Sequence, residues 1–131
     1  METLEQYIER HTQNKEKASD FVEFLFLLME RHGYKDKDSI LYKKAGISRQ
    51  LWSSIISGKS MPGINTILKI VFALELNNRE CKYLLKKAGF TLASSSKFSL
   101  IIRYCIENKI YDLLIVNQYL EENGYSDRLI Y

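Results

Sequence analysis

Proline, cysteine and long apolar runs are scarce in this chain. Its 131 residues include one proline, two cysteines and six glycines. With a single proline at Pro62 and no long Gly/Ser tract, nothing in the sequence indicates a flexible linker. Period-two alternation of apolar residues, which is typical of half-buried strands, is also rare. We therefore expect an all-α protein of about one domain, large enough for a real core.

The two cysteines, Cys81 and Cys105, each lie in an apolar helical pattern, which predicts buried free thiols. Without a Cys-x-x-Cys pair or clustered histidines, we expect no disulfide, no metal site and no cofactor. The longest apolar run, residues 24–29, is too short to cross a bilayer. The acidic first residues do not resemble a signal peptide. These features predict a cytoplasmic protein without a membrane partner.

Motifs of known enzyme classes are missing as well. The chain has no glycine-rich phosphate loop, no His/Cys cluster and no nucleophile with a base at motif spacing. Its carboxylates lie on predicted helix surfaces, where solvated charge is the default. His11 is expected at a surface or packing position, and His32 in a last helical turn, where the helix dipole favours positive charge. We expect a protein without catalytic residues.

The net charge of +3 hides an uneven distribution. Residues 1–33 carry four Lys/Arg and seven Asp/Glu, residues 34–90 carry eleven and four, and residues 91–131 carry four and five. The net charges are therefore −3, +7 and −1. Positive charge is concentrated in the middle segment, as neutralisation of DNA phosphates requires. The alternative is chance variation among surface lysines.

Apolar spacing predicts helices along the whole chain. A short helix over 3–13 and a polar break at 14–17 precede Asp20-x-x-Glu23, which resembles a capping box opening a second helix over 20–32. Further helices are predicted over 38–45, 48–57, 64–74, 77–88, 98–106 and 112–120. A glycine followed by a hydrophobic residue, the Schellman pattern, marks four helix ends: Gly33-Tyr34, Gly46-Ile47, Gly89-Phe90 and Gly124-Tyr125.

The helix over 48–57 has two contrasting sides. Ser48 is a suitable N-cap, and Gly58 supplies the left-handed residue that ends the helix. The apolar stripe consists of Leu51, Trp52, Ile55 and Ile56, and the polar side of Arg49, Gln50, Ser53, Ser54 and Ser57. A helix that reads a DNA groove needs one buried face and short polar groups with an arginine on the other.

Residues 20–88 resemble the lambda-repressor-like helix-turn-helix domain (Cro-type, XRE family). The residues that carry the resemblance are Leu41, Ala45-Gly46-Ile47-Ser48, Trp52, Ile55, Gly58-Lys59, Pro62, the helix over 67–76 and Asn77-x-x-Glu80. The resemblance implies a five-helix domain over 20–90, an extra N-terminal helix and connector over 1–19, and a two-helix extension over 91–131. Tyr42 and Ile56 depart from the family, which commonly has alanine and glutamate at these positions.

The resemblance also implies which residues contact double-stranded DNA. Arg49 and Gln50 match base-contacting positions, where arginine can pair with guanine and glutamine with adenine. Residues that match positions for bases or phosphates are Ser53, Ser54, Lys59, Ser60, Ser39 and Lys43. The alternative for each is a solvated surface residue. Trp52 matches a buried position, as do Leu41, Ala45 and Ile55.

Two functions are compatible with these observations. The first is a sequence-specific DNA-binding transcriptional regulator of bacterial or phage origin, forming a homodimer through residues 91–131, whose apolar helices need a domain, a twin or another protein to cover them. The second is a protein-interaction module that has kept the fold, such as an antitoxin, an antirepressor or a phage-defence component. The serine-rich reading helix, Tyr42, Ile56 and the acidic flanks favour this alternative.

Overall fold

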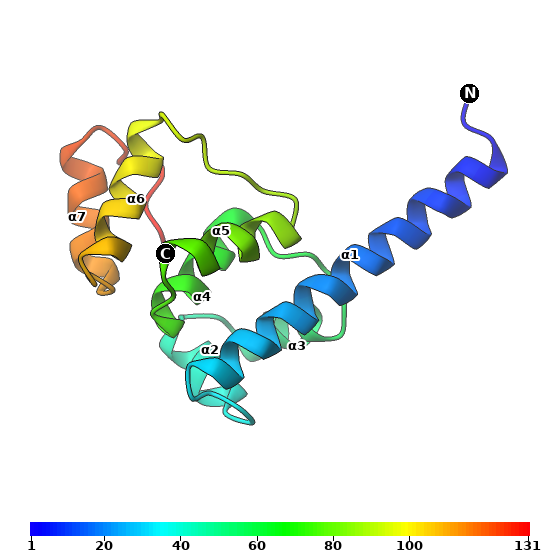
Figure 1. The fold of residues 1–131 in the computed structure, drawn as a ribbon, viewed down its shortest axis with the longest axis horizontal. Coiled ribbons are helices and arrows are strands. Elements are labelled where there is room, and N and C mark those ends of the chain that lie inside the picture. Colours follow the sequence, from blue (N-terminus) through cyan, green and yellow to red (C-terminus); the bar gives the residue numbers. More distant parts are fainter.

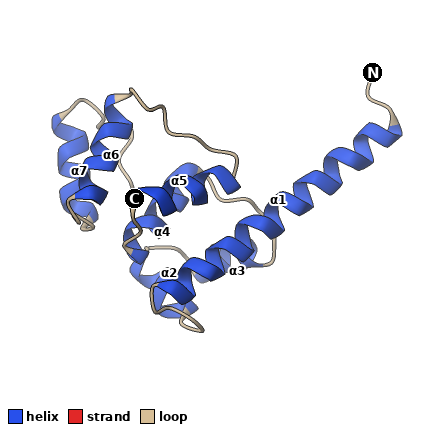
Figure 2. Ribbon diagram, viewed as in Figure 1, coloured by secondary structure: helices blue, strands red, loops and turns tan.

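The computed structural model describes the backbone of residues 1–131 and the side chains of residues 1–8 and 20–131. The elements are α1 (Leu4–Arg31), α2 (Asp38–Lys44), α3 (Arg49–Ile56), α4 (Ile64–Leu74), α5 (Asn78–Lys87), α6 (Lys97–Glu107) and α7 (Leu113–Glu122). The described backbone contains helices and loops but no strand (Figure 2). The predicted all-α class is confirmed.

One long helix replaces the two that we predicted before residue 33. Thr3 caps α1 in a capping box with Gln6, in which each side chain accepts a backbone amide of the other residue. Asp20 and Glu23 lie inside α1, so the predicted break and the second helix start are wrong. The polar stretch contains no glycine or proline, and polar character alone does not stop a helix. The prediction for His11 lies outside the described side chains.

Glycine ends five helices as predicted: Gly58 ends α3, and each of the other four glycines is followed by a hydrophobic residue. After Gly33, Gly46, Gly89 and Gly124, the next residue donates its amide to a carbonyl five residues earlier, over 2.7 to 2.9 Å. These glycines have φ between 69° and 87°, a region that favours glycine because it lacks a Cβ. Glu75 and Lys109 end α4 and α6 with φ of 55° and 56°. Neither residue is a glycine, so these two ends lack the glycine signal, although apolar spacing predicted both helices to within one residue of their observed bounds.

The core forms around α4. Nearly all its residues from Ile67 to Leu74 are buried, and α4 packs against α2 and α5. The C-terminal part of α1 packs against α5, while α6 and α7 form a pair at the other side of α5 (Figure 1). The N-terminus lies at the end of the molecule far from this pair (Figure 1).

The C-terminal extension is buried on its own chain. The buried residues of its helices and tail are Phe98, Ser99, Ile102, Cys105, Ile106, Val116, Leu120 and Ile130. Tyr111 donates its hydroxyl to the Leu76 carbonyl at 3.0 Å, and Asn65 donates to the Leu129 carbonyl at 3.2 Å. The sequence left open whether this apolar segment is covered by its own chain, by a second copy or by another protein. In the structure, the rest of the same chain covers its main apolar stripe.

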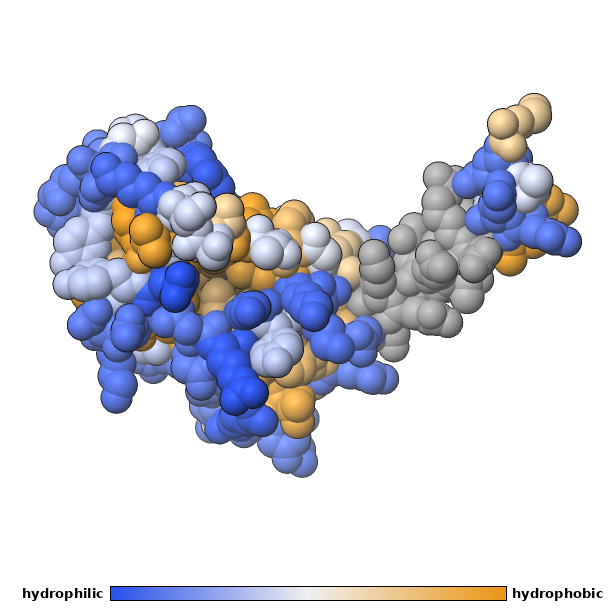
Figure 3. Space-filling view, turned by 45° about the horizontal axis from the view of Figure 1, so that its top comes forward, coloured by the Kyte–Doolittle hydropathy of each residue, from blue (hydrophilic) through white to orange (hydrophobic). Residues whose placement is uncertain are grey.

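On the face drawn in Figure 3, apolar side chains gather toward the middle of the body, with hydrophilic side chains around them. None of the described helices combines the length and the apolar character needed to span a bilayer.

Candidate nucleic-acid interface

Helices α2 and α3 are joined by a short connection that local chemistry fixes. Gly46 adopts the left-handed conformation, and Ile47 donates its amide to the Tyr42 carbonyl at 2.8 Å. Ser48 then caps α3, because its hydroxyl accepts the Leu51 amide at 3.1 Å. The end of one helix and the start of the next are thus set within four residues.

Trp52 fixes how α3 lies against α2. The indole is buried, and its Nε1 donates to the Asp38 carboxylate at 2.9 Å. The centroids of the indole ring and the Tyr42 ring are 6.2 Å apart. Tyr42 is partly buried and packs against the indole at the edge of the core.

The buried face of this helix pair agrees with the predicted core. Trp52, Ile55, Leu41 and Ala45 are all buried, and Ile47, which that prediction did not include, is buried beside them. The predicted apolar stripe of α3 is only partly covered, since Ile56 is half-buried and Leu51 keeps 38% of its surface exposed. A helix of eight residues offers two turns, and its buried face is narrow.

The opposite face of α3 holds the predicted contact residues around one open hollow of about 530 Å³. Its lining residues are Arg49, Gln50, Ser53, Ser54, Ser57 and Lys59. The lining includes two cations and no carboxylate. Ser57 is the lining residue that we did not name as a contact, although it lies on the predicted polar side.

The remaining predicted contacts lie beside this hollow or away from it. The Ser60 hydroxyl is 2.9 Å from the Ser54 hydroxyl, so it adjoins the hollow. Ser39 and Lys43 are exposed on α2 and are not part of its lining. The structure therefore groups five of the eight residues directly and a sixth through one hydrogen bond.

The loop after α3 is held against the end of that helix. Lys59 and Ser60 both donate their amides to the Ser54 carbonyl, at 3.0 and 3.2 Å. Gly58 has φ of 77°, which permits the chain to turn back there. Lys59 is thereby positioned near the helix C-terminus, where the partial negative charge of the helix favours a cation.

A polar cluster around Glu80 was not predicted. Its carboxylate, 5% exposed, accepts from Arg31 Nη1 at 3.2 Å and the Asn77 amide at 3.0 Å, and lies 2.9 Å from His32 Nε2. Burial raises the pKa of Glu80, but the Asn77 amide, His32 and Arg31 together hold it below its usual value. The capping box predicted the contact with Asn77, but no local pattern predicts contacts that span about fifty residues.

The cysteines offer little reactivity. Cys81 and Cys105 are free and buried, as predicted. Burial raises the pKa of Cys81 to about 12, so its thiol stays protonated at neutral pH. Among the side chains that the structure describes, no group of three or more His, Cys, Asp or Glu could hold a metal ion.

The arrangement around α3 can donate hydrogen bonds and attract anions.

Comparisons with protein-family models, curated proteins and solved structures find no match to this chain.

Proposed function

We propose that this protein is a sequence-specific DNA-binding regulator of the lambda-repressor-like helix-turn-helix type, with α3 as its reading helix. The observation that carries the proposal is the exposed face of α3. Arginine, glutamine, serines and lysine surround one hollow there, and no carboxylate takes part. The major groove of DNA admits an α-helix whose side chains donate to base edges.

Each residue of this face has a role in the proposal. Arg49 pairs with a guanine and Gln50 with an adenine, because both lie in the first turn of α3. Ser53 and Ser54 reach bases or phosphates one turn later, and Lys59 and Ser60 contact the sugar-phosphate backbone of the DNA. On the other side of the groove, Ser39 and Lys43 of α2 contact a phosphate.

The charge distribution supports the same proposal. Residues 34–90 contain α2 to α5 and carry a net charge of +7, whereas the segments before and after are acidic. Neutralised phosphates release counterions, so binding by this segment weakens steeply as salt increases.

The proposal is tested by fluorescence anisotropy with duplexes from the promoter of the protein's own gene and with scrambled duplexes, at low and near-physiological salt. A preference for one duplex that survives the higher salt supports a sequence reader. Equal binding to all duplexes, or none, contradicts the assignment on that operator.

The Arg49→Ala variant adds a residue-level test. We expect a loss of roughly 1–3 kcal/mol at one base position of the preferred duplex, with relaxed preference there. Arg79→Ala, which removes an exposed arginine from α5, is the matched control and should keep the preference. Full retention of sequence preference by Arg49→Ala would rule out its role as a base contact.

A protein-interaction module, such as an antitoxin, antirepressor or phage-defence component, is the second candidate. A specific observation favours it: Ile40 on α2, Leu51 on α3 and Met61 in the following loop are large apolar side chains exposed to solvent. A surface that reads only DNA does not need them. Partner binding that persists in high salt, without DNA binding, would favour this candidate.

A further inference from the structure

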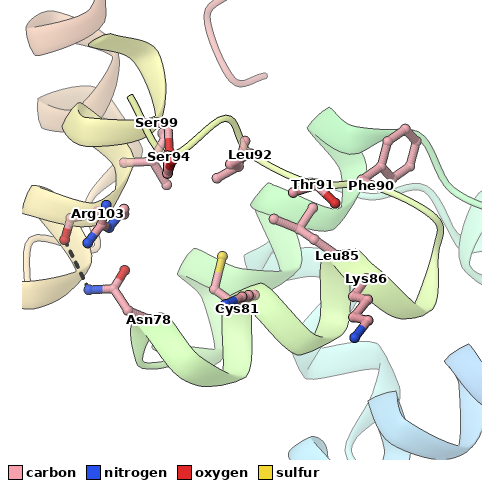
Figure 4. A pocket seen from close by; sticks show the side chains of 12 residues that line it. Asn78, Cys81, Leu85, Lys86, Phe90, Thr91, Leu92, Ser94, Ser99 and Arg103 are labelled. Carbon is pink, nitrogen blue, oxygen red and sulfur yellow. Dashed lines mark hydrogen bonds between the residues drawn. The ribbon is translucent and has the colours of Figure 1, made fainter. Parts of the chain in front are cut away.

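A second pocket lies between α5, α6 and the connector that joins them (Figure 4). Its volume is about 570 Å³, within the range of sites that bind small molecules. Asn78 on α5 donates to the Arg103 carbonyl on α6 at 3.3 Å, which links the two helices beside the pocket (Figure 4). None of the lining residues belongs to α3, so this pocket is separate from the candidate DNA interface.

The inner wall of the pocket is apolar. Leu85, Phe90, Leu92 and Ile102 contribute hydrocarbon, and the Cys81 sulfur points from α5 toward the connector (Figure 4). The Cys81 thiol is buried and protonated, so it behaves as a small apolar group. A ligand that fills this space therefore needs an apolar body.

Cations surround this apolar wall. Lys82 and Lys86, one turn apart on α5, and Arg103 on α6 line the pocket and have exposed side chains. No aspartate or glutamate is among the twelve lining residues. The local charge is therefore +3 without compensation inside the lining, which favours an anionic group on the ligand.

The Ser99 hydroxyl gives the pocket a buried polar group. Ser99 is 1% exposed and lines the pocket from α6, and its Oγ has no hydrogen-bond partner in the described structure. Leaving a buried hydroxyl without a partner costs free energy, and nearly all such groups in folded proteins are satisfied. A ligand oxygen in the pocket would satisfy it.

We propose that the pocket between α5 and α6 binds a small amphipathic anion, with an apolar body and one carboxylate. The body lies against Leu85, Phe90 and Ile102, the carboxylate faces the cations, and Ser99 donates a hydrogen bond to a carboxylate oxygen. The site does not rest on DNA recognition, so it stands or falls independently of the function proposed above.

The test is a titration of the full-length, isotope-labelled protein with decanoate, without DNA, followed by amide chemical shifts. We expect saturable shifts confined to α5, α6 and residues 90–94. Decyltrimethylammonium has an aliphatic chain of similar length and the opposite charge, and it should bind at least about tenfold more weakly. A parallel titration with 2-naphthoate shows whether the pocket prefers an aliphatic or an aromatic acid. Saturation at these residues by decanoate or by 2-naphthoate supports the site.

Variants assign the interaction to individual groups. Lys82→Gln and Arg103→Gln should each weaken decanoate by about two- to fivefold, since exposed ion pairs are modest. Lys35→Gln, which removes an exposed lysine between α1 and α2, is the matched control and should not change it. Ser99→Ala should weaken decanoate while keeping or raising the melting temperature, a combination that a purely structural hydroxyl would not produce.

Three results would overturn the proposal. These are the absence of saturable binding by both acids, shifts centred outside α5, α6 and the connector, and equal binding of decanoate by the wild type and the Lys82→Gln/Arg103→Gln double variant. Because none of the measurements involves DNA, failure of this site leaves the DNA-binding test unaffected, and the reverse also holds.

Discussion

The carboxylate of Glu80 links parts of the chain that are far apart in sequence. It completes the capping box of α5 with Asn77 and contacts Arg31 and His32 at the end of α1. Because these contacts favour the charged form and outweigh the effect of burial, the folded protein binds a proton at Glu80 less readily than the unfolded chain does.

Removing the Glu80 charge should destabilise the fold. Glu80→Gln keeps an acceptor for the Asn77 amide but loses the charged partner of Arg31 and His32, and we expect a loss of about 1–3 kcal/mol at pH 7. Urea unfolding measures this loss. Glu23→Gln, which removes an exposed carboxylate from α1, is the control and should change stability by less than about 0.5 kcal/mol.

The same carboxylate predicts a pH dependence. Its folded pKa lies below the unfolded value of about 4.3, so its contribution is complete above that value and is lost as pH falls through the folded pKa. The stability difference between wild type and Glu80→Gln should therefore shrink as urea unfolding is repeated from pH 7 down toward pH 3. A difference that stays constant over this range would show that the Glu80 charge is not the cause.

At the level of the elements, short helices depend on their ends. Helix α3 has eight residues and would not be stable in isolation, so its cap and its packing against α2 together hold it. Ser48 accepts the Leu51 amide at the start, and Gly58 permits the turn at the end. The face proposed to read DNA is therefore positioned by residues that need not touch DNA.

Loss of the Ser48 cap should lower the stability of this region. Ser48→Ala leaves the Leu51 amide without its side-chain partner, and we expect a loss of about 0.5–2 kcal/mol in thermal unfolding. Ser53→Ala is the matched control, because Ser53 is also exposed on α3 and alanine is the better helix former there. Equal losses in both variants would contradict the assignment of Ser48 as the cap.

At the level of the whole molecule, α6 and α7 close over the core of their own chain and still present apolar side chains outward. Leu100 and Tyr104 on α6 and Leu114 and Ile115 on α7 are exposed, with Leu114 at 81%. The homodimer that the sequence analysis predicts through residues 91–131 would use these outer side chains, since the inner stripe is already buried.

A charged residue on this outer surface should prevent a dimer without unfolding the chain. Leu114→Glu places a carboxylate in the first turn of α7, where the helix dipole favours it, and removes no buried contact. Sedimentation equilibrium should report a dimer for the wild type and a monomer for the variant, with unchanged circular dichroism. A wild type that sediments as a monomer up to about 100 µM, or a dimeric variant, would contradict this interface.

Residue spacing was enough to predict the helical class, most helix boundaries and the polar face of α3. Capping by Ser48, Asn77, Ser96 and Asp112 depends on residues two or three positions away, and the glycine ends depend on residues five positions away. Such interactions are local, so their signals remain legible in the sequence. The helix start that we wrongly predicted at Asp20 also came from a local signal. Asp20-x-x-Glu23 has the pattern of a cap but lies within α1.

Which distant residues meet depends on how the helices pack against one another in three dimensions. The contact of Glu80 with His32, the packing of the extension on its own chain, and the pocket that gathers Lys82, Ser99 and Arg103 all join separate helices. None of these has a fixed spacing in sequence, because the directions in which helices pack depend on the shapes of all the buried side chains together. For that reason residue spacing predicts the ends and faces of these helices, while the clusters between them appear only when the core is assembled.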